Sequence, residues 1–311
     1  MSEEVLSKFS VYESVTGKIA AAIEAGAGSF MMPWHAGIAP IAMPLNAVSK
    51  APYRGINIIA LWAEAAVKRY VTGYWASYRQ WQEMGAQVRR NERGATVVFF
   101  KKVEKGDDEA LDEEQPRFVA RAYRVFNSYQ VDGWQLPLPE KKSEVHANQQ
   151  IEAFVKATGA DVRYGGLVAR YRHDLDCIEI PAPDRFVGTN TSTPTESYYA
   201  VLLHELTHLS GAAHRLNRVF GRRFGDEAYA FEELVAELGS AFLCSIFGIT
   251  NEPRYDHAAY VSSWLDILGR DNKAIFAAAS HAQKAVEYLM QLATSNNRQK
   301  EANSTSSTDG Q

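Results

Sequence analysis

Apolar residues recur at intervals of three or four along most of this chain, and this spacing places them on one face of an α-helix. Gly and Pro residues interrupt the pattern and mark where helices end. The helices predicted in this way cover residues 5–25, 57–70, 77–84, 150–158, 193–209, 226–247, 255–268 and 271–292. The pattern indicates a largely helical protein, above all in its C-terminal half.

Two segments rich in β-branched and aromatic residues interrupt the helical pattern. Residues 96–103 and 118–126 are predicted to be strands that pair as a hairpin. The connection between them, residues 104–114, is dense in Asp and Glu, which is typical of a solvated loop. A further short strand is predicted over residues 177–180, where Pro181 ends it. The chain therefore belongs to the α+β class.

The length and composition fit two globular domains. The chain has 311 residues, of which 46% are hydrophobic and 23% charged, so each domain is large enough to have its own core. Residues 131–144 contain Gly133, Pro137 and Pro139, a composition typical of a linker. We predict a first domain over residues 1–135, a linker over 136–148, a mainly helical second domain over 149–292 and a disordered tail over 293–311.

Several function classes are excluded by what the sequence lacks. The two cysteines, Cys177 and Cys244, are isolated, so we expect no disulfide framework and a reducing, cytoplasmic location. We expect no membrane partner, since no apolar stretch approaches the roughly 20 residues that span a bilayer. No GxxxxGK[ST] loop is present, so we expect no dependence on ATP.

The motif with the most specific chemistry is His-Glu-Leu-Thr-His at residues 204–208. Positions i and i+4 share a helix face, so His204 and His208 can bind one metal ion from the same side. Glu205 lies about 100° further round the helix, where it can act as the general base that takes a proton from water. Zn²⁺ is the favoured ion, with Mn²⁺ as an alternative. The chemistry implied is hydrolysis of a peptide or amide bond.

Two residues compete to be the third ligand. His214 completes the spacing HExxHxxGxxH that metzincin proteases use. That class also has a methionine turn downstream, and here no Met follows His214 until residue 290. The rival is Glu233, in the helix predicted over residues 226–247.

On that helix Glu233 and Glu237 lie one turn apart, on a face that they share with small residues. Glu233 would bind the metal and Glu237 would orient an imidazole. Glu232 is expected to point elsewhere. Helical face and spacing favour Glu233 over His214, although both stay open on the residues alone.

The N-terminal half contains a basic stretch. Residues 50–103 hold ten Lys and Arg against three Glu, a local charge of +7 in a chain whose net charge is −4. Aromatic residues are interleaved with the bases, and they are Tyr53, Trp62, Tyr70, Tyr74, Trp75, Tyr78 and Trp81. Cations that bind phosphates and rings that stack on bases are what single-stranded nucleic acid requires. The composition equally fits an ordinary domain with its aromatics in the core, where we expect Trp62 and Trp81.

Several segments resemble ArdC-type antirestriction proteins, which conjugative plasmids carry. The runs His204–Arg218 and Phe224–Leu238 resemble their zincin-like domain. Residues similar to their N-terminal domain lie at 44–57, 74–80, 85–94 and 123–127. The resemblance implies a gluzincin-like second domain in which a glutamate of the later helix joins both histidines at the metal, and this favours Glu233. It also implies that the N-terminal domain binds single-stranded DNA.

The DNA contacts implied by the Tyr-Arg-Gly-Ile-Asn and Trp-containing segments are Arg54, Asn57, Trp75 and Tyr78. From the basic stretch we add Arg89, Arg90 and Lys101.

Our leading hypothesis is a protein that protects incoming plasmid DNA from host restriction by binding single-stranded DNA and cleaving a host protein. Residues 177–180 would pair with the extended substrate. Two alternatives remain. In one, the protein coats DNA and its metal site is purely structural. In the other, it is a peptidase whose basic surface is unrelated to DNA.

Overall fold

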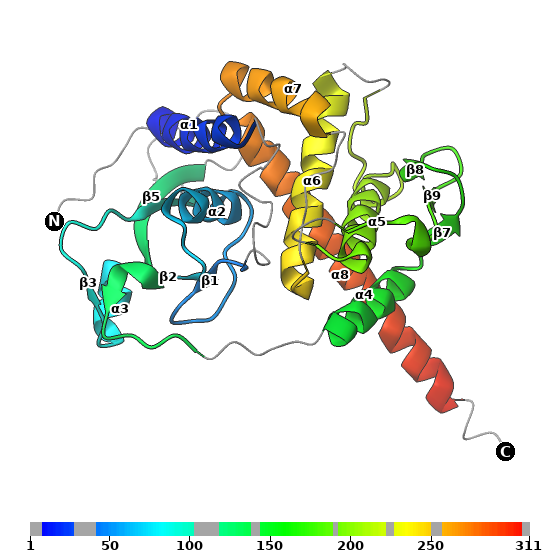
Figure 1. Cartoon of the computed structure of the whole chain (residues 1–311), viewed down its shortest axis with the longest axis horizontal. Helices are drawn as coiled ribbons and strands as arrows, with labels where there is room; N and C mark the ends of the chain where they lie inside the picture. The colour runs from blue at the N-terminus through cyan, green and yellow to red at the C-terminus, as the bar shows by residue number, and fades with distance from the viewer. Residues whose placement is uncertain are drawn as a thin grey trace, which may run out of the picture.

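The computed structural model describes residues 8–27, 42–102, 118–137, 144–188, 192–221, 227–249 and 257–306. The predicted acidic loop over residues 104–114 lies outside the described residues, as do residues 138–143 of the predicted linker over residues 136–148. Figure 1 shows the N-terminal half on the left and the C-terminal half on the right, with the last helix passing behind α6 toward the lower right.

The N-terminal half is a four-stranded sheet covered by helices. Its helices are α1 (Lys8–Ala27), α2 (Ile56–Lys68) and α3 (Tyr78–Glu83), and its strands are β1 (Leu45–Asn46), β2 (Tyr74–Ser77), β3 (Gln87–Val88), β4 (Ala95–Lys102), β5 (Phe118–Asn127) and β6 (Val131–Asp132). The sheet order is β1-β2-β5-β4, and β3 pairs separately with β6. β4 and β5 are antiparallel neighbours, so the predicted hairpin is confirmed.

The C-terminal half consists of helices around a small sheet. Its helices are α4 (Glu144–Thr158), α5 (Pro194–Ser210), α6 (Glu227–Phe247), α7 (His257–Arg270) and α8 (Ala274–Ser306), and its strands are β7 (Asp161–Tyr164), β8 (Arg170–Arg172) and β9 (Cys177–Ile180). The strand order is β7-β9-β8, with β9 parallel to β7 and antiparallel to β8. α5, α6 and α8 pack against one another. The mainly helical second half is therefore confirmed, although β7 and β8 escaped the sequence analysis.

The two halves share a hydrophobic core, contrary to the expectation of two separate ones. The ring of Tyr12 in α1 lies 4.5 Å from that of Phe276 in α8, and the ring of Trp62 in α2 lies 5.7 Å from that of Phe242 in α6. A smaller second cluster surrounds Trp81. Burial of Trp62 and Trp81 confirms their predicted place in the core.

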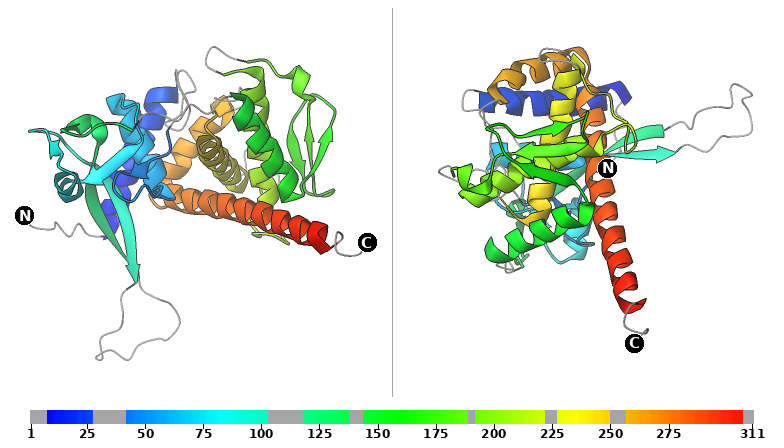
Figure 2. Two further views of the ribbon diagram at one scale, coloured as in Figure 1. Left: turned by 90° about the horizontal axis from the view of Figure 1, so that it is seen from below. Right: turned by 90° about the vertical axis from the view of Figure 1, so that its right-hand side faces the viewer.

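The last helix extends further than predicted. α8 continues to Ser306, and the side-chain amide of Asn296 donates a hydrogen bond of 2.9 Å to the carbonyl of Ala157 in α4. The prediction of disorder from residue 293 is therefore wrong as far as residue 306, and residues 307–311 lie outside the described part. The sequence analysis predicted disorder because this stretch is polar and has no apolar periodicity. Figure 2 shows α8 starting beside the N-terminal sheet and ending at the far side of the other half.

None of the described helices has an apolar stretch long enough to cross a membrane.

Candidate metal centre and nucleic-acid interface

The helix that contains the histidine motif begins at a well-defined cap. The hydroxyl of Thr193 accepts a hydrogen bond from the backbone N–H of Glu196 (3.2 Å), and the Glu196 carboxylate accepts one from the N–H of Thr193 (2.9 Å). Pro194 occupies the first turn, where it costs no hydrogen bond. The predicted capping box is confirmed, and it determines the residue at which the helix starts.

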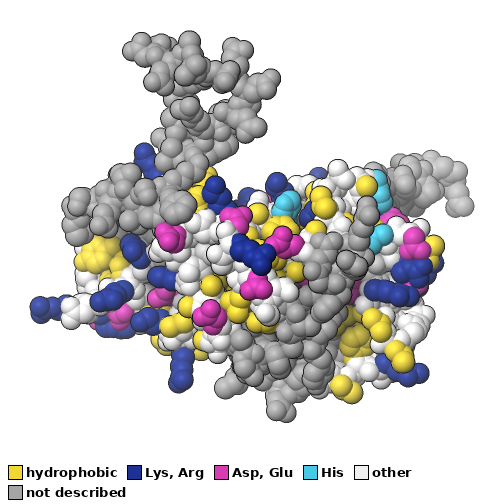
Figure 3. All heavy atoms as spheres, turned by 90° about the horizontal axis from the view of Figure 1, so that it is seen from above, with side chains coloured by type: hydrophobic (Ala, Val, Ile, Leu, Met, Phe, Trp, Pro, Cys, Tyr) yellow, Lys and Arg dark blue, Asp and Glu magenta, His cyan; other side chains and the backbone are white. Residues whose placement is uncertain are grey.

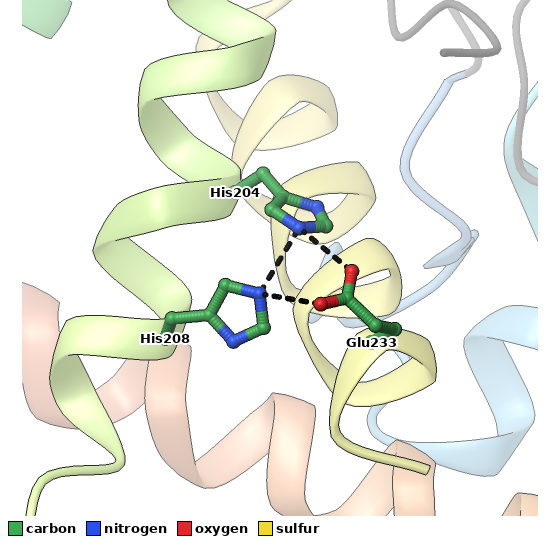
Figure 4. Close-up of side chains that lie close together, drawn as sticks. All are labelled: His204, His208 and Glu233. Atoms are coloured by element: carbon green, nitrogen blue, oxygen red, sulfur yellow. Dashed lines mark hydrogen bonds and ion pairs between the residues drawn. The ribbon is translucent and has the colours of Figure 1, made fainter. Parts of the chain in front are cut away.

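The side chains of His204, His208 and Glu233 converge between α5 and α6, as Figure 4 shows. The two Nε2 atoms of the histidines are 3.1 Å apart. The Glu233 carboxylate oxygens lie 3.5 Å from Nε2 of His204 and 3.6 Å from Nε2 of His208. The histidines are buried, and the side chain of Glu233 is 13% exposed.

These distances fit the ligands of one metal ion. Two atoms bound at about 2.0–2.1 Å to a tetrahedral ion are roughly 3.3–3.4 Å apart. The three separations between the ligand atoms differ from that value by a few tenths of an ångström. Two imidazoles and a carboxylate are also the ligand set of many catalytic zinc sites, which keep a fourth position open.

A buried ion pair lies directly behind His208. Glu232 Oε1 is 3.1 Å from Nδ1 of His208, on the opposite side of the ring from the metal cluster. Arg218 donates to both oxygens of Glu232, at 2.9 and 2.8 Å, and to the carbonyl of Thr207 at 2.6 Å. Burial raises the pKa of the Glu232 carboxyl, but the hydrogen bonds and charges of His208 and Arg218 outweigh burial and hold that pKa below its usual range. The carboxylate therefore fixes the orientation of the His208 ring.

The role of Glu232 escaped the sequence analysis. As expected, it does not point into the metal cluster, yet it contacts one of the histidines. Glu237 lies behind the other histidine, with Oε2 at 3.6 Å from Nδ1 of His204. No local pattern identifies the pair of Glu232 and Arg218, because the residues are 14 positions apart and meet only through the fold.

Glu205 is buried and hydrogen-bonded to a strand. Its carboxylate accepts the backbone N–H of Tyr171 in β8 at 2.9 Å. This places the side chain between α5 and the edge of the small sheet.

The position of β9 corrects the expectation for residues 177–180. β9 is the middle strand and pairs with β7 on one side and β8 on the other, so it has no free edge for a substrate. β8 has a partner on one side only among the described strands.

His214 lies away from the cluster. Its imidazole is 62% exposed, and Nε2 is 3.3 Å from an oxygen of Asp176. The same carboxylate accepts hydrogen bonds from Arg215 at 2.6 and 2.8 Å. The chain after α5 therefore turns His214 toward the β8–β9 connection, where an acidic side chain contacts it.

Two of the predicted DNA contacts are structural residues. Trp75 is 1% exposed, and Asn57 is 6% exposed. The Asn57 side chain donates to the carbonyl of Val98 (2.9 Å) and accepts from its N–H (2.7 Å), which fastens α2 to β4. That Trp75 and Asn57 contact DNA stays a prediction, which the burial of both side chains does not favour.

The other predicted contacts are spread over the N-terminal half. Arg54 is exposed and forms an ion pair with Glu287 of α8. Arg89 is exposed, beside Glu92 (3.0 Å) and Asp132 (3.4 Å). Arg90 is exposed. The hydroxyl of Tyr78 lies 3.0 Å from the side-chain amide of Gln87. Lys101 lies in β4, opposite Val119 of β5. Figure 3 shows Lys and Arg side chains projecting from the left-hand end of one face, formed by the N-terminal half.

Comparison with known proteins assigns a family to each half. A model of zincin-like metallopeptidases matches residues 149–281, and a model of the N-terminal domain of anti-restriction factor ArdC matches residues 9–131. An uncharacterized protein of Sinorhizobium fredii, y4eC, is 44% identical over 285 residues, which cover 90% of this chain and 91% of that protein. The DNA primase TraC of Escherichia coli is 34% identical over 298 residues, but these are only 27% of its length.

Two solved structures are similar over nearly their whole length. They are the metal-free and Mn(II)-bound crystal structures of the antirestriction protein ArdC from plasmid R388, which are 39% identical to this chain. Their TM-scores are 0.73 and 0.71, and the match covers 91% of this chain and 98% and 97% of theirs. The fold and site thus define a zincin-like metallopeptidase domain joined to an ArdC-type N-terminal domain. The chain belongs to the ArdC family of antirestriction proteins.

Proposed function

We propose that this protein binds single-stranded DNA through its N-terminal half and hydrolyses a host protein at a metal site in its C-terminal half, so that incoming plasmid DNA escapes restriction in the cytoplasm. The observation that supports the hydrolytic part is the convergence of His204, His208 and Glu233, which could hold a metal ion, together with the position of Glu205 on the helix that carries both histidines. The Mn(II)-bound structure of the R388 protein supports a divalent ion.

In this proposal His204, His208 and Glu233 hold Zn²⁺ or Mn²⁺, and Glu205 is the general base. An ion held by these three side chains would supply Lewis-acid chemistry, lowering the pKa of a water molecule and polarising the carbonyl of the scissile bond. Glu205 takes the proton from water and later passes it to the leaving amine. Glu232 and Glu237 keep the two imidazole rings in the orientation that binds the ion.

We also propose a division of the chain at residues 136–148, with DNA-binding residues before it and the metallopeptidase-like domain over residues 149–292. The ranges matched by the two family models support this division. Of the predicted DNA contacts, Arg54, Tyr78, Arg89, Arg90 and Lys101 remain in the proposal.

The decisive experiment is a Glu205→Gln variant of the full chain. We expect it to bind zinc and single-stranded DNA as the wild type does, since Gln keeps the shape of the side chain. Protection of a plasmid transferred into a restricting host should be lost, because Gln cannot accept the proton. Full protection by this variant would contradict hydrolysis.

The ligand set is tested by titrating metal into three variants. His204→Ala and Glu233→Ala should lose zinc binding, while His214→Ala should retain it. Loss of binding in His214→Ala, with Glu233→Ala unaffected, would support the metzincin alternative.

A second function, coating of DNA with a structural metal site, has one observation in its favour. The Glu205 carboxylate is buried and bonded to the backbone of β8, as a purely structural residue would be. Under this alternative the Glu205→Gln variant protects DNA fully, while substitutions that abolish DNA binding remove protection.

A further inference from the structure

A groove of about 1330 Å³ lies between the N-terminal sheet and α8. It is larger than the roughly 300–1,000 Å³ typical of small-molecule pockets. Residues from β4 and β5 form one wall, and residues of α8 form the other. Its size and its two walls suit a polymer better than a metabolite.

Exposed aromatic side chains line the sheet wall. Phe99 of β4 is 50% exposed and Tyr123 of β5 is 42% exposed. Their ring centroids are 5.5 Å apart in an edge-to-face arrangement, above the buried side chains of Val97 and Val125. Large exposed rings are costly in water, so a pair of them held over a rigid apolar floor favours a ligand that stacks on them.

The opposite wall supplies positive charge. Lys273 immediately precedes α8, and Lys284 lies about three helical turns further along the same side of the helix. Both lysines line the groove, and both are exposed. Neither lysine forms an ion pair with an acidic residue of the described ranges. The two glutamates that line the groove are each paired with an arginine, Glu287 with Arg54 and Glu83 with Arg79. The lysine charges are therefore available to an anionic ligand.

We propose that this groove is the site of single-stranded DNA and that α8, an element of the metallopeptidase-like half, forms one of its walls. The proposal rests on the DNA-binding function proposed above. Unpaired bases would stack on Phe99 and Tyr123, and phosphates would face Lys273 and Lys284. A duplex is excluded from this mode, because its bases are already stacked on one another.

The consequence is that the DNA site and the metal site share a helix. α8 packs against α5 and α6, which provide His204, His208 and Glu233. It contacts α2 of the N-terminal half as well. Binding of DNA in the groove therefore depends on residues outside the segment, residues 9–131, that matches the ArdC N-terminal model.

The test measures binding of a fluorescently labelled oligothymidylate to the full-length protein by fluorescence anisotropy. The oligonucleotide has about 15 nucleotides, a length within the range that such grooves cover. The first variant is Phe99→Leu with Tyr123→Leu, which keeps apolar volume but removes the ring faces. We expect its affinity to fall by about 5- to 150-fold for each base that loses its stacking partner. Tyr129 is 43% exposed outside the groove, so Tyr129→Leu is the matched control and should bind as the wild type does.

The second variant is Lys273→Ala with Lys284→Ala, and Lys156→Ala in α4 is its control. The slope of log affinity against log salt should become shallower by about 1.4, because two phosphate contacts of a single strand are lost at about 0.7 each. The control should keep the wild-type slope. Unfolding curves of all variants should match the wild type, because every substituted side chain is exposed.

The outcomes separate the two proposals. Suppose that both groove variants bind as the wild type does while the double variant Arg89→Ala with Arg90→Ala loses affinity. The proposal that DNA binds in the groove is then overturned, and the proposed DNA-binding function stands. If the wild type itself shows no salt-dependent affinity for the oligonucleotide, the proposed DNA-binding function fails. If loss of the rings has no effect but loss of the lysines does, stacking in the groove is overturned.

Discussion

The close approach of α5 and α6 at Gly239 leads to a prediction with a definite sign. A Cβ atom at Gly239 would lie 2.5 Å from Cγ2 of Thr207 and 2.8 Å from its Oγ1. Carbon atoms in contact are normally about 3.5–4.0 Å apart, so a Gly239→Ala substitution forces the two helices apart by on the order of 1 Å at this point.

Two opposing terms decide the change in stability. Alanine in place of glycine inside a helix gains about 1 kcal/mol from helix propensity. Overpacking of a buried contact costs about 1–3 kcal/mol, and Thr207 is fully buried. We therefore expect Gly239→Ala to destabilise the protein by up to about 2 kcal/mol.

The same shift should weaken the metal site. Thr207 precedes His208, and Gly239 lies between Glu237 and the end of α6, so a wider gap lengthens the distances of 3.5 and 3.6 Å between Glu233 and the histidines. We expect the affinity for Zn²⁺ to fall by about 10-fold, as for other residues that position metal ligands. Urea unfolding and calorimetric titration of the same preparations measure both effects.

A double-mutant cycle with Thr207→Ala isolates the contact. If the clash is the cause, the double variant should be more stable than the sum of the single effects by about 1 kcal/mol or more. A Gly239→Ala protein that is stabilised by about 1 kcal/mol and binds zinc normally would refute this reasoning.

Three further predictions concern buried or charged pairs. Arg218→Ala should destabilise the protein by about 3–5 kcal/mol, because it leaves Glu232 buried without its cation; adding Glu232→Gln should recover part of the loss in urea unfolding. Asn57→Ala should cost about 1–3 kcal/mol through the two lost bonds to Val98, whereas the affinity of the folded variant for oligothymidylate should match the wild type. Hydrogen bonds from Arg215 hold the pKa of Asp176 below its ordinary value of 3.8. The ionised carboxylate therefore stabilises the fold above about pH 4, and this contribution is lost as the pH falls further. The difference in unfolding midpoint between wild type and Asp176→Asn should accordingly shrink in acid, and a difference independent of pH would show that the charge is irrelevant.

Local patterns in the sequence were enough for most helices and for the hairpin. The capping box at Thr193 and the apolar spacing that follows it identify α5, because a helix start and a helix face are properties of neighbouring residues. The same holds for His204 and His208, which share a face of any helix that contains them. The spacing of the motif was therefore sufficient to predict two of the three side chains of the metal cluster.

The tertiary structure decided the contacts between elements that are distant in sequence. Glu233 and His214 were both compatible with the spacing of metal-ligand motifs in the sequence. Only the packing of α6 against α5 brings Glu233 to His204 and His208, whereas His214 lies against Asp176. The same packing, permitted by Gly239, brings Glu232 to His208. Composition could not distinguish Trp75, which is buried in the core, from Phe99 and Tyr123, which are exposed beside α8. An aromatic residue is equally suited to a core and to a stacking surface, and its place is determined by the elements that pack on it.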